Sequence, residues 1–308
     1  MVIGGSARRY LAERCIRFGI FCVTLYIPVN FKAMKRVVVL YVILALAVSC
    51  GGRGKVKRTE TATQTPPSAA ALREPVRYTY RVRGVYPHDT DAYTQGLFWL
   101  DGYLYEGTGR NGHSELRRVE PATGRVVQRA GLDKKYFGEG IACLDGKIYQ
   151  LTWVAGRAFV YDAEQFRPMR SFVYDGEGWG LTTDGEYLYM SDGSDRIQVR
   201  DAENFGVVRT LEVRAGGRPV DMLNELEWID GRIWANVYLT DRVAIIDPHT
   251  GEVTGEVDFG GLQTPADRTP DTDVFNGIAY DAATGDIYVT GKNWNKVYKV
   301  EIFEKEEE

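Results

Sequence analysis

Glu139 is the residue in this sequence best suited to acid–base chemistry, and it lies between two glycines in the segment FGEGI. Glycines let the backbone approach a ligand closely, and neighbouring aromatic residues exclude water. A carboxyl group in such surroundings is expected to have a raised pKa, which a proton shuttle near neutral pH needs. The residue taken alone is equally compatible with a structural glutamate that is hydrogen-bonded to backbone amides.

Lys292, in the segment VTGKNW, is the second candidate for a catalytic role. Its ammonium group could stabilise negative charge that develops on an oxygen, or it could pair with Glu139. A solvated lysine at a strand end is the alternative, and for a single lysine it is the commoner outcome. Four large aromatic side chains could line a pocket for a flat, uncharged group, although singly such residues more often belong to a core. These four are Tyr93, Trp153, Trp179 and Tyr238.

Amide side chains accompany these residues, whereas sets of metal ligands do not. Three amides could bind amide or amine groups of a ligand, or could instead cap free backbone groups. They are Gln95, Asn224 and Asn276. The three histidines lie in turns without ligand spacing, and the sequence has neither a glycine-rich phosphate loop nor a Ser-His-Asp arrangement. The sequence therefore predicts chemistry without a metal ion or other cofactor.

A fivefold sequence repeat positions the candidate residues. The copies are QGLFWLDGYLY, EGIACLDGKIY, WGLTTDGEYLY, NELEWIDGRIW and NGIAYDAATGDIY, which begin at Gln95, Glu139, Trp179, Asn224 and Asn276. Their first positions lie 44, 40, 45 and 52 residues apart, which is the period of a four-stranded propeller blade. The repeat predicts an all-β fold, a five-bladed β-propeller over residues 76–305, in which the first residue of each copy lies at one mouth of the central channel.

The fifth repeat lacks a signal for a fourth strand. The N-terminal segment Arg77–Tyr86 has the alternation of apolar and polar residues that would fill this gap. Pairing the first strand with the last blade would close the ring and remove exposed sheet edges. The longer final spacing is explained by Leu262–Asp273, which is rich in Pro and Asp and is expected to be a loop.

Hairpin geometry predicts which further residues reach the mouth. Two strands with a tight turn return to their starting edge after about 14 residues. Counting from the five first positions gives Gly109, Trp153, Gly193, Tyr238 and Thr290. Trp153 should therefore lie beside Glu139. Tyr238 should lie beside Asn224, with Lys292 just beyond.

The N-terminal part of the chain has the features of a targeting signal. Met34-Lys-Arg precedes an apolar run of 13 residues that ends at Cys50, and LAVSC resembles the bacterial lipoprotein signal. We expect residues 34–50 to be a lipoprotein-type signal peptide, with Cys50 lipidated, and residues 1–33 to be an upstream segment before the true start. A plain membrane anchor or a signal with a chance cysteine is the alternative. Residues 51–75 lack periodicity and are expected to be a flexible tether. These features predict a protein of the bacterial cell envelope, anchored to a membrane through lipid and facing the periplasm or the exterior.

The charge of the chain argues against nucleic acid as a partner. Residues 1–58 carry eleven Lys or Arg and one acidic residue, so the remaining residues carry 27 basic and 41 acidic groups. The folded part is thus strongly acidic, whereas nucleic-acid-binding domains are basic.

Many motifs in order closely resemble the plant-type and bacterial glutaminyl-peptide cyclotransferases, also called glutamine cyclotransferases. The motifs are YTQGL, YEGTG, FGEGI, YQLTW, EGWGLTTDG, MSDGS, LNELEWIDG, ANVYLTD, IDP, NGIAYD and VTGKNW, and they extend over roughly Tyr78–Phe303. The resemblance implies a five-bladed propeller that converts N-terminal glutamine of peptides or proteins to pyroglutamate, releases ammonia and needs no metal ion. The chain is expected to act as a monomer.

The resemblance also implies roles for individual residues. Glu139 would be the general acid/base and Lys292 would stabilise the oxyanion. The pocket would be formed by Tyr93, Gln95, Phe137, Trp153, Trp179, Asn224 and Tyr238. Tyr93 stands where the family usually has Phe, and Tyr238 where it usually has Trp, which puts the width and polarity of the pocket in doubt. The competing interpretations are a non-catalytic propeller lipoprotein that binds peptides or sugars, and a structural envelope protein.

Overall fold

Antiparallel hairpins make up almost all of the computed structural model, which describes residues 73–306. These residues form 22 strands and one short 3-10 turn, Pro265–Asp267, without an α-helix. None of the helical structure in this range is long or apolar enough to span a membrane. The expected segments 1–33 and 34–50, the lipidation site Cys50, and residues 51–72 of the expected tether lie outside the described residues.

Three four-stranded antiparallel sheets follow one another along the chain. The first contains β2 (Thr94–Leu100), β3 (Tyr103–Thr108), β4 (Glu115–Glu120) and β5 (Arg125–Gly131). The second contains β6 (Gly138–Leu144), β7 (Lys147–Thr152), β8 (Arg157–Asp162) and β9 (Pro168–Val173). The third contains β10 (Leu181–Thr183), β11 (Leu188–Ser191), β12 (Arg196–Arg200) and β13 (Val207–Glu212). A small ribbon of β14 (Arg214–Ala215) and β15 (Arg218–Pro219) comes next.

The remaining strands form one eight-stranded sheet in the order β16-β17-β18-β19-β1-β22-β21-β20. Its first half contains β16 (Leu223–Ile229), β17 (Arg232–Val237), β18 (Arg242–Ile246) and β19 (Val253–Asp258). Its second half contains β20 (Phe275–Asp281), β21 (Asp286–Gly291), β22 (Lys296–Glu304) and β1 (Val76–Pro87). The antiparallel pairing of β1 with β22 confirms that the N-terminal strand completes the last group of strands.

A second pairing of β1 was not predicted. The start of this strand also pairs in parallel with β19, from Val76 opposite Gly255 to Tyr78 opposite Val257. A side chain at Gly255 would lie 2.7 Å from the Tyr78 ring, so a larger residue here would force that ring to shift. The first strand therefore joins two groups of strands into one eight-stranded sheet instead of completing only the last group.

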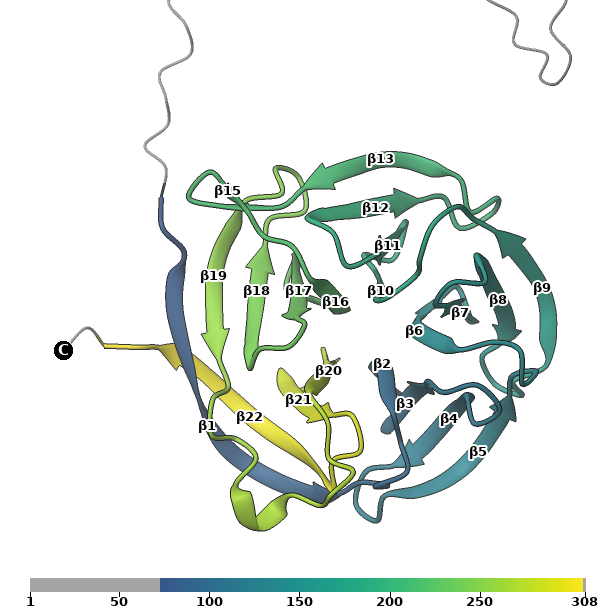
Figure 1. Ribbon diagram of the computed structural model, residues 1–308, viewed down its shortest axis with the longest axis horizontal. Helices are drawn as coiled ribbons and strands as arrows, with labels where there is room; N and C mark the ends of the chain where they lie inside the picture. Colours follow the sequence, from purple (N-terminus) through teal and green to yellow (C-terminus); the bar gives the residue numbers. More distant parts are fainter. Residues whose placement is uncertain (1–72, 307–308) are drawn as a thin grey trace, which may run out of the picture. The chain divides into compact units, whose positions relative to one another are not determined.

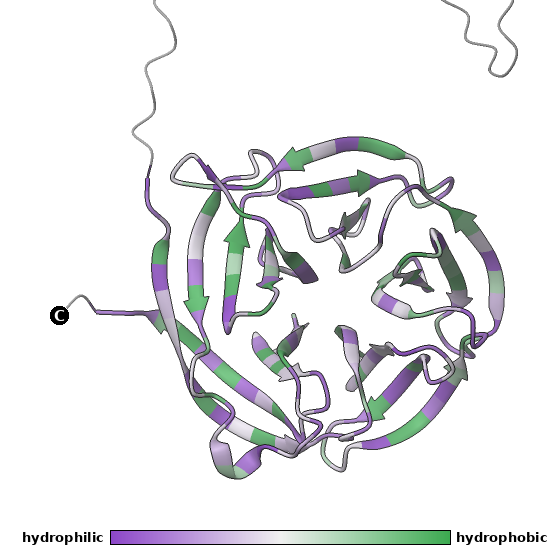
Figure 2. Cartoon of the chain, viewed as in Figure 1, coloured by the Kyte–Doolittle hydropathy of each residue, from purple (hydrophilic) through white to green (hydrophobic). Residues whose placement is uncertain are grey.

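The sheets are arranged in a β-propeller-like ring around a central axis (Figure 1). The innermost strands are β2, β6, β10, β16 and β20, and the strands β5, β9, β13 and β1 lie at the periphery. Hydrophobic and hydrophilic residues alternate along these strands (Figure 2), and the apolar residues pack between neighbouring sheets. Ile197 of β12, for example, lies in one buried cluster with Leu226 of β16 and Ile233 of β17.

Glycines allow the inner strands to approach one another at the axis. In four of the five copies a glycine follows the variable first residue. A side chain at Gly140 would lie 2.6 Å from the amide nitrogen of Leu181, and one at Gly180 would lie 2.0 Å from the carbonyl oxygen of Asn224. Because these are backbone atoms, the ring could not close so tightly with larger residues at these positions.

Candidate active site

A β-bulge lies at the variable first residue in four of the inner strands. The register shifts between Thr94 and Gly96, Gly138 and Ile141, Leu223 and Leu226, and Phe275 and Ile278. A bulge re-aims a side chain away from the regular alternation of a strand. The same local irregularity therefore re-aims the unlike first residue in four of the five repeats.

Glu139 is buried at the mouth, where only 4% of its surface is exposed. The Nε2 atom of Gln95 donates a hydrogen bond of 3.0 Å to its Oε1 atom, whereas the buried Oε1 atom of Gln95 has no partner among the described residues. Burial raises the pKa of Glu139 well above its usual value, as the sequence predicted. The Lys292 ammonium opposes this shift, and the Glu177 carboxylate adds to it.

Lys292 is almost completely buried between two tyrosine rings. Its Nζ atom lies 5.0 Å from the ring centre of Tyr93 and 4.9 Å from that of Tyr238, which favours the cation electrostatically. Burial lowers the pKa of Lys292, while Glu139 and Asp273 oppose that shift. Among the described residues, Lys292 makes no direct ion pair with either carboxylate, so its ammonium group is available to a ligand.

The hairpin count was wrong for the fifth repeat. The amide of Trp153 donates to the carbonyl of Phe137, and the amide of Tyr238 donates to that of Met222. The equivalent bond in the fifth repeat comes from Lys292, to Val274, and not from Thr290. The reason is a longer turn: four residues separate β20 from β21, whereas two separate β2 from β3.

The five predicted aromatic residues line the mouth in an arc of edge-to-face contacts. The Tyr93 and Phe137 rings lie 6.2 Å apart at 87°, and the Phe137 and Trp153 rings lie 5.7 Å apart at 65°. The Trp179 and Tyr238 rings lie 5.5 Å apart at 82°. With Lys292 between Tyr238 and Tyr93, the predicted residues nearly encircle the mouth.

Glu177 closes the remaining gap, and sequence reasoning missed it. Its Oε2 atom accepts hydrogen bonds from the indole nitrogens of both Trp153, at 2.6 Å, and Trp179, at 2.9 Å. One carboxylate oxygen thus fixes the orientation of both indoles. Its position in the EGWG motif, two residues before Trp179, was the available signal.

Tyr93 brings a second carboxylate to the mouth. Its hydroxyl donates a hydrogen bond of 2.9 Å to Asp273, and burial together with Asp273 raises its pKa far above the ordinary value. The phenol therefore stays protonated. The hydroxyl group that distinguishes Tyr93 from phenylalanine is thus bonded to Asp273, in the loop before β20.

The two asparagines take different positions. Asn224 is buried, and its main-chain carbonyl oxygen accepts a hydrogen bond of 2.6 Å from the Ser191 hydroxyl. The hydrogen bonds and ring contacts around Glu139 do not involve the Asn224 side chain. Asn276 donates through Nδ2 to the carbonyl of Thr94 at 3.0 Å, which is the capping role stated as the alternative for these amides.

Two further buried carboxyl groups, Glu225 and Glu227, lie on the same inner strand, and the sequence analysis missed both. The Glu225 carboxylate accepts hydrogen bonds from the backbone amides of Leu97, at 3.1 Å, and Ile278, at 2.9 Å. The Glu227 carboxylate accepts one from the amide of Tyr280 at 2.9 Å, and burial raises its pKa to about 8. The available signal was that Glu225 stands where the other four copies have glycine.

The arrangement at the mouth is suited to proton transfer at a polar carbon–oxygen group. Glu139 can exchange a proton, Lys292 can stabilise an oxyanion, and Gln95 presents a free acceptor, all inside an aromatic wall that limits water. Within residues 73–306, no group of three or more His, Cys, Asp or Glu side chains is placed to hold a metal ion. Fold and site together define a β-propeller-like protein with a cluster of acid–base residues and aromatic rings where its inner strands begin.

Comparisons with known proteins agree with this description. The family model described as glutamine cyclotransferase matches residues 55–302, and the chain belongs to this family of glutaminyl-peptide cyclotransferase enzymes, as the motifs predicted. The chain is 37% identical over 221 residues to glutaminyl-peptide cyclotransferase from Arabidopsis thaliana, which covers 70% of this chain and 69% of the relative. The crystal structure of Myxococcus xanthus glutaminyl cyclase matches with a TM-score of 0.70 and 35% identity, over 76% of this chain and all of the other.

Proposed function

We propose that this protein converts N-terminal glutamine of peptides or proteins to pyroglutamate and releases ammonia. The observation that carries the proposal is a buried Glu139 that accepts a hydrogen bond from the Gln95 amide and is influenced by the charge of the Lys292 ammonium, near a set of aromatic rings. In the reaction, a bond forms between the α-nitrogen and the side-chain carbonyl carbon of the same residue. The bond from that carbon to the amide nitrogen breaks, and the proton lost by the amine leaves with ammonia.

The pocket residues divide this work among them. Folding the glutaminyl side chain back on its own amine can supply several kcal/mol through orientation, and the rings of Trp153 and Trp179 are suited to hold its aliphatic stem. Glu139 accepts a proton from the attacking amine and returns it to the leaving nitrogen. Lys292 stabilises the oxyanion of the tetrahedral intermediate. The free oxygen of Gln95 accepts an N–H of the substrate, whose α-amine has a pKa near 8 in free peptides and is partly neutral at physiological pH.

We further propose that the four-stranded groups function as the five blades of a monomeric propeller and that the reaction needs no metal ion. Support comes from the closure by β1 and from the absence of ligand spacing in the sequence. The lipid anchor at Cys50 and a position in the bacterial cell envelope, facing the periplasm or exterior, also belong to the proposal. They rest on the LAVSC signal alone.

The competing function is a propeller that binds peptides or sugars without turnover. The same aromatic mouth would serve such a role, since binding sites without a catalytic base are also lined by aromatic rings and a few polar groups. The enzyme is favoured because the carboxyl group is buried with a raised pKa and only one donor, which simple binding does not require.

The decisive test is ammonia release and pyroglutamate formation from a short peptide with N-terminal glutamine. We expect turnover by the wild-type protein that a chelator does not reduce, and a loss of about 10²–10⁴-fold in kcat/KM for Glu139→Gln. The matched control is Glu227→Gln, which changes another buried carboxyl group of the channel and should leave kcat/KM within about twofold. Saturable binding of the peptide without turnover would establish the binding module instead.

A further inference from the structure

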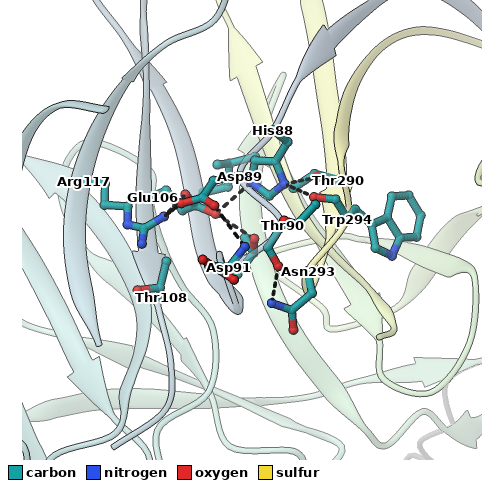
Figure 3. A network of polar contacts seen from close by, with 12 residues as sticks. His88, Asp89, Thr90, Asp91, Glu106, Thr108, Arg117, Thr290, Asn293 and Trp294 are labelled. Carbon is teal, nitrogen blue, oxygen red and sulfur yellow. Dashed lines mark hydrogen bonds and ion pairs between the residues drawn. The ribbon is translucent and has the colours of Figure 1, made fainter. Parts of the chain in front are cut away.

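A buried polar network around His88 lies outside the proposed mechanism. Both ring nitrogens of His88 face acceptors: Nδ1 lies 2.8 Å from the carbonyl oxygen of Trp294, and Nε2 lies 3.0 Å from Oε1 of Glu106 (Figure 3). The hydroxyl of Thr94 also donates to that Glu106 oxygen, at 2.7 Å. An imidazole that donates from both nitrogens carries a positive charge.

The network has nearly balanced charges. Arg117 lies 2.9 Å from a carboxylate oxygen of Asp89 and 3.9 Å from Glu106, and it also pairs with Glu115 at 2.9 Å. Burial by itself lowers the pKa of His88, but the Glu106 carboxylate and the Trp294 carbonyl raise it above the ordinary value. Because His88 and Glu106 are almost completely buried, the pair is shielded from competing water.

The backbone connects this network directly to the turn that carries Lys292. The amide of His88 donates to the carbonyl of Asn295 at 3.0 Å, and the amide of Asn293 donates to the carbonyl of Ala92 at 2.8 Å. The segment His88–Ala92 leads into β2. It is thus hydrogen-bonded along the turn Gly291–Asn295, which begins at the last residue of β21. These two segments and their mutual hydrogen bonds are called the clasp below.

Asn293 fixes the clasp next to the ammonium-bearing residue. It has a φ of 59°, in the left-handed region. Its Nδ2 atom donates to the carbonyl of Thr90 at 2.7 Å (Figure 3). Its Oδ1 atom accepts from Arg110 at 2.8 Å. The Arg110 guanidinium also lies 4.5 Å from the ring centre of Tyr93, which is one of the two rings that hold Lys292.

We propose that His88 and Asn293 are positioning residues that hold Lys292 and the β2 strand with Gln95 in fixed relation across the mouth. This inference rests on the proposed function, because it assigns the clasp to the geometry of the oxyanion site. Gln95 and Lys292 come from opposite ends of the folded chain, on β2 and after β21, so contacts between these two segments contribute to their separation, together with the bond between Asn276 and the Thr94 carbonyl. A displacement of about 1 Å at a reacting group can cost about 100-fold in rate.

The test is a double-mutant cycle with peptide turnover. His88→Ala and Asn293→Gly are each made in the wild-type protein and in Lys292→Met. Glycine at 293 keeps the left-handed backbone and removes only the side-chain bonds. We expect each change to lower kcat about 10-fold to 100-fold with Lys292 present and less than twofold without it. An equal loss in both backgrounds, or no loss with Lys292 present, overturns the proposal.

A measurement that does not need activity accompanies the cycle. Amide hydrogen exchange of peptides covering 88–95 and 291–296 should rise in both variants. The matched control, Arg200→Met, removes a buried guanidinium that donates to the Phe205 carbonyl at 2.7 Å, and should leave both peptides unchanged. If the wild-type protein turns over no glutaminyl peptide, the proposed function fails, and this exchange pattern alone decides whether the clasp exists; unchanged exchange in His88→Ala and Asn293→Gly refutes it.

Discussion

Two buried carboxyl groups of the central channel, Glu139 and Glu225, differ in how their charge is balanced. Burial raises the pKa of both well above the ordinary value. Glu225 accepts two backbone amides, from Leu97 and Ile278, on strands that cannot move independently of the ring. Within residues 73–306, Glu139 accepts one hydrogen bond, from the Gln95 side chain, and the oxygen of that Gln95 amide has no partner.

This difference in hydrogen bonding distinguishes a structural carboxyl group from a candidate catalytic one within the same ring of strands. A fully buried carboxylate whose two oxygens both accept backbone amides, as in Glu225, ties strands together and is out of reach of a ligand. A carboxylate with one mobile donor and a nearby unpaired cation is poorly solvated until a substrate arrives. Burial and a raised pKa alone therefore do not identify a catalytic acid; incomplete hydrogen bonding at an accessible mouth does.

The largest expected effect comes from making the same substitution at both positions. Glu225→Leu leaves two buried amides without acceptors and should lower the free energy of unfolding by about 2–6 kcal/mol, since each unpaired group costs about 1–3 kcal/mol. Glu139→Leu leaves one buried donor, the Gln95 amide, without its acceptor but also removes a poorly balanced buried carboxyl group, so it should lower that free energy by only about 0–2 kcal/mol. Chemical denaturation of both variants measures the difference. A loss at Glu139 as large as that at Glu225 would make Glu139 the structural glutamate of the alternative interpretation.

A smaller effect is expected from removing the cation. Lys292→Met should lower kcat about 10²-fold to 10³-fold, because an oxyanion donor is lost while the apolar stem still packs between the tyrosine rings. The matched control is Lys299→Met, which breaks a partly buried pair with Asp286 at 2.6 Å on the outer side of β21 and should leave kcat within about twofold. Comparable losses of kcat in the two variants would show that activity depends on the net charge of the protein and not on the position of the Lys292 ammonium at the mouth.

The main elements of the fold could be predicted from the repeat, whereas its irregularities could not. Alternating residues and the 40–52-residue spacing predict strands and their order, and the missing fourth strand predicts the pairing of β1 with β22. The parallel pairing of β1 with β19 depends on how two peripheral strands meet in space, and Gly255 gives no sign of it in the sequence. The turn after β20 shifted the hairpin count by two residues, because loop length varies without changing the strand pattern.

The site was predictable where the repeat is broken by an unlike residue. Glu139, Gln95 and Trp179 occupy one structural position, so the sequence could place them together. Glu177 and Asp273 lie in loops, where no periodicity fixes the direction of a side chain, and both were missed. Their partners, the indoles and the Tyr93 hydroxyl, became visible only with the folded geometry.

The smallest expected effect, a shift in pH dependence, tests the charges around Glu139 in opposite directions. The Lys292 ammonium opposes the raised pKa of Glu139, and the Glu177 carboxylate increases it. A general base must be ionised, so kcat/KM should rise with pH through the pKa of Glu139 in the free enzyme. Lys292→Met removes the cation, raises that pKa further and should move this limb to higher pH. Glu177→Gln removes a like charge, lowers the pKa of Glu139 and should move the limb to lower pH, while the glutamine carbonyl oxygen can still accept hydrogen bonds from the indoles.

Ionisation of the substrate amine contributes the same limb to every variant, so the differences between variants report on the enzyme. Full pH profiles of kcat/KM for wild type, Lys292→Met and Glu177→Gln measure them, and Glu227→Gln is the control, since its carboxyl group is not among the charges that shift the pKa of Glu139. Opposite shifts would assign the limb to a carboxyl group that faces both residues, which is the position of Glu139 and not of Glu225. Shifts in the same direction, or none, would mean that the titrating group is elsewhere. Glu139 would then no longer differ in function from the buried structural carboxyl group of Glu225.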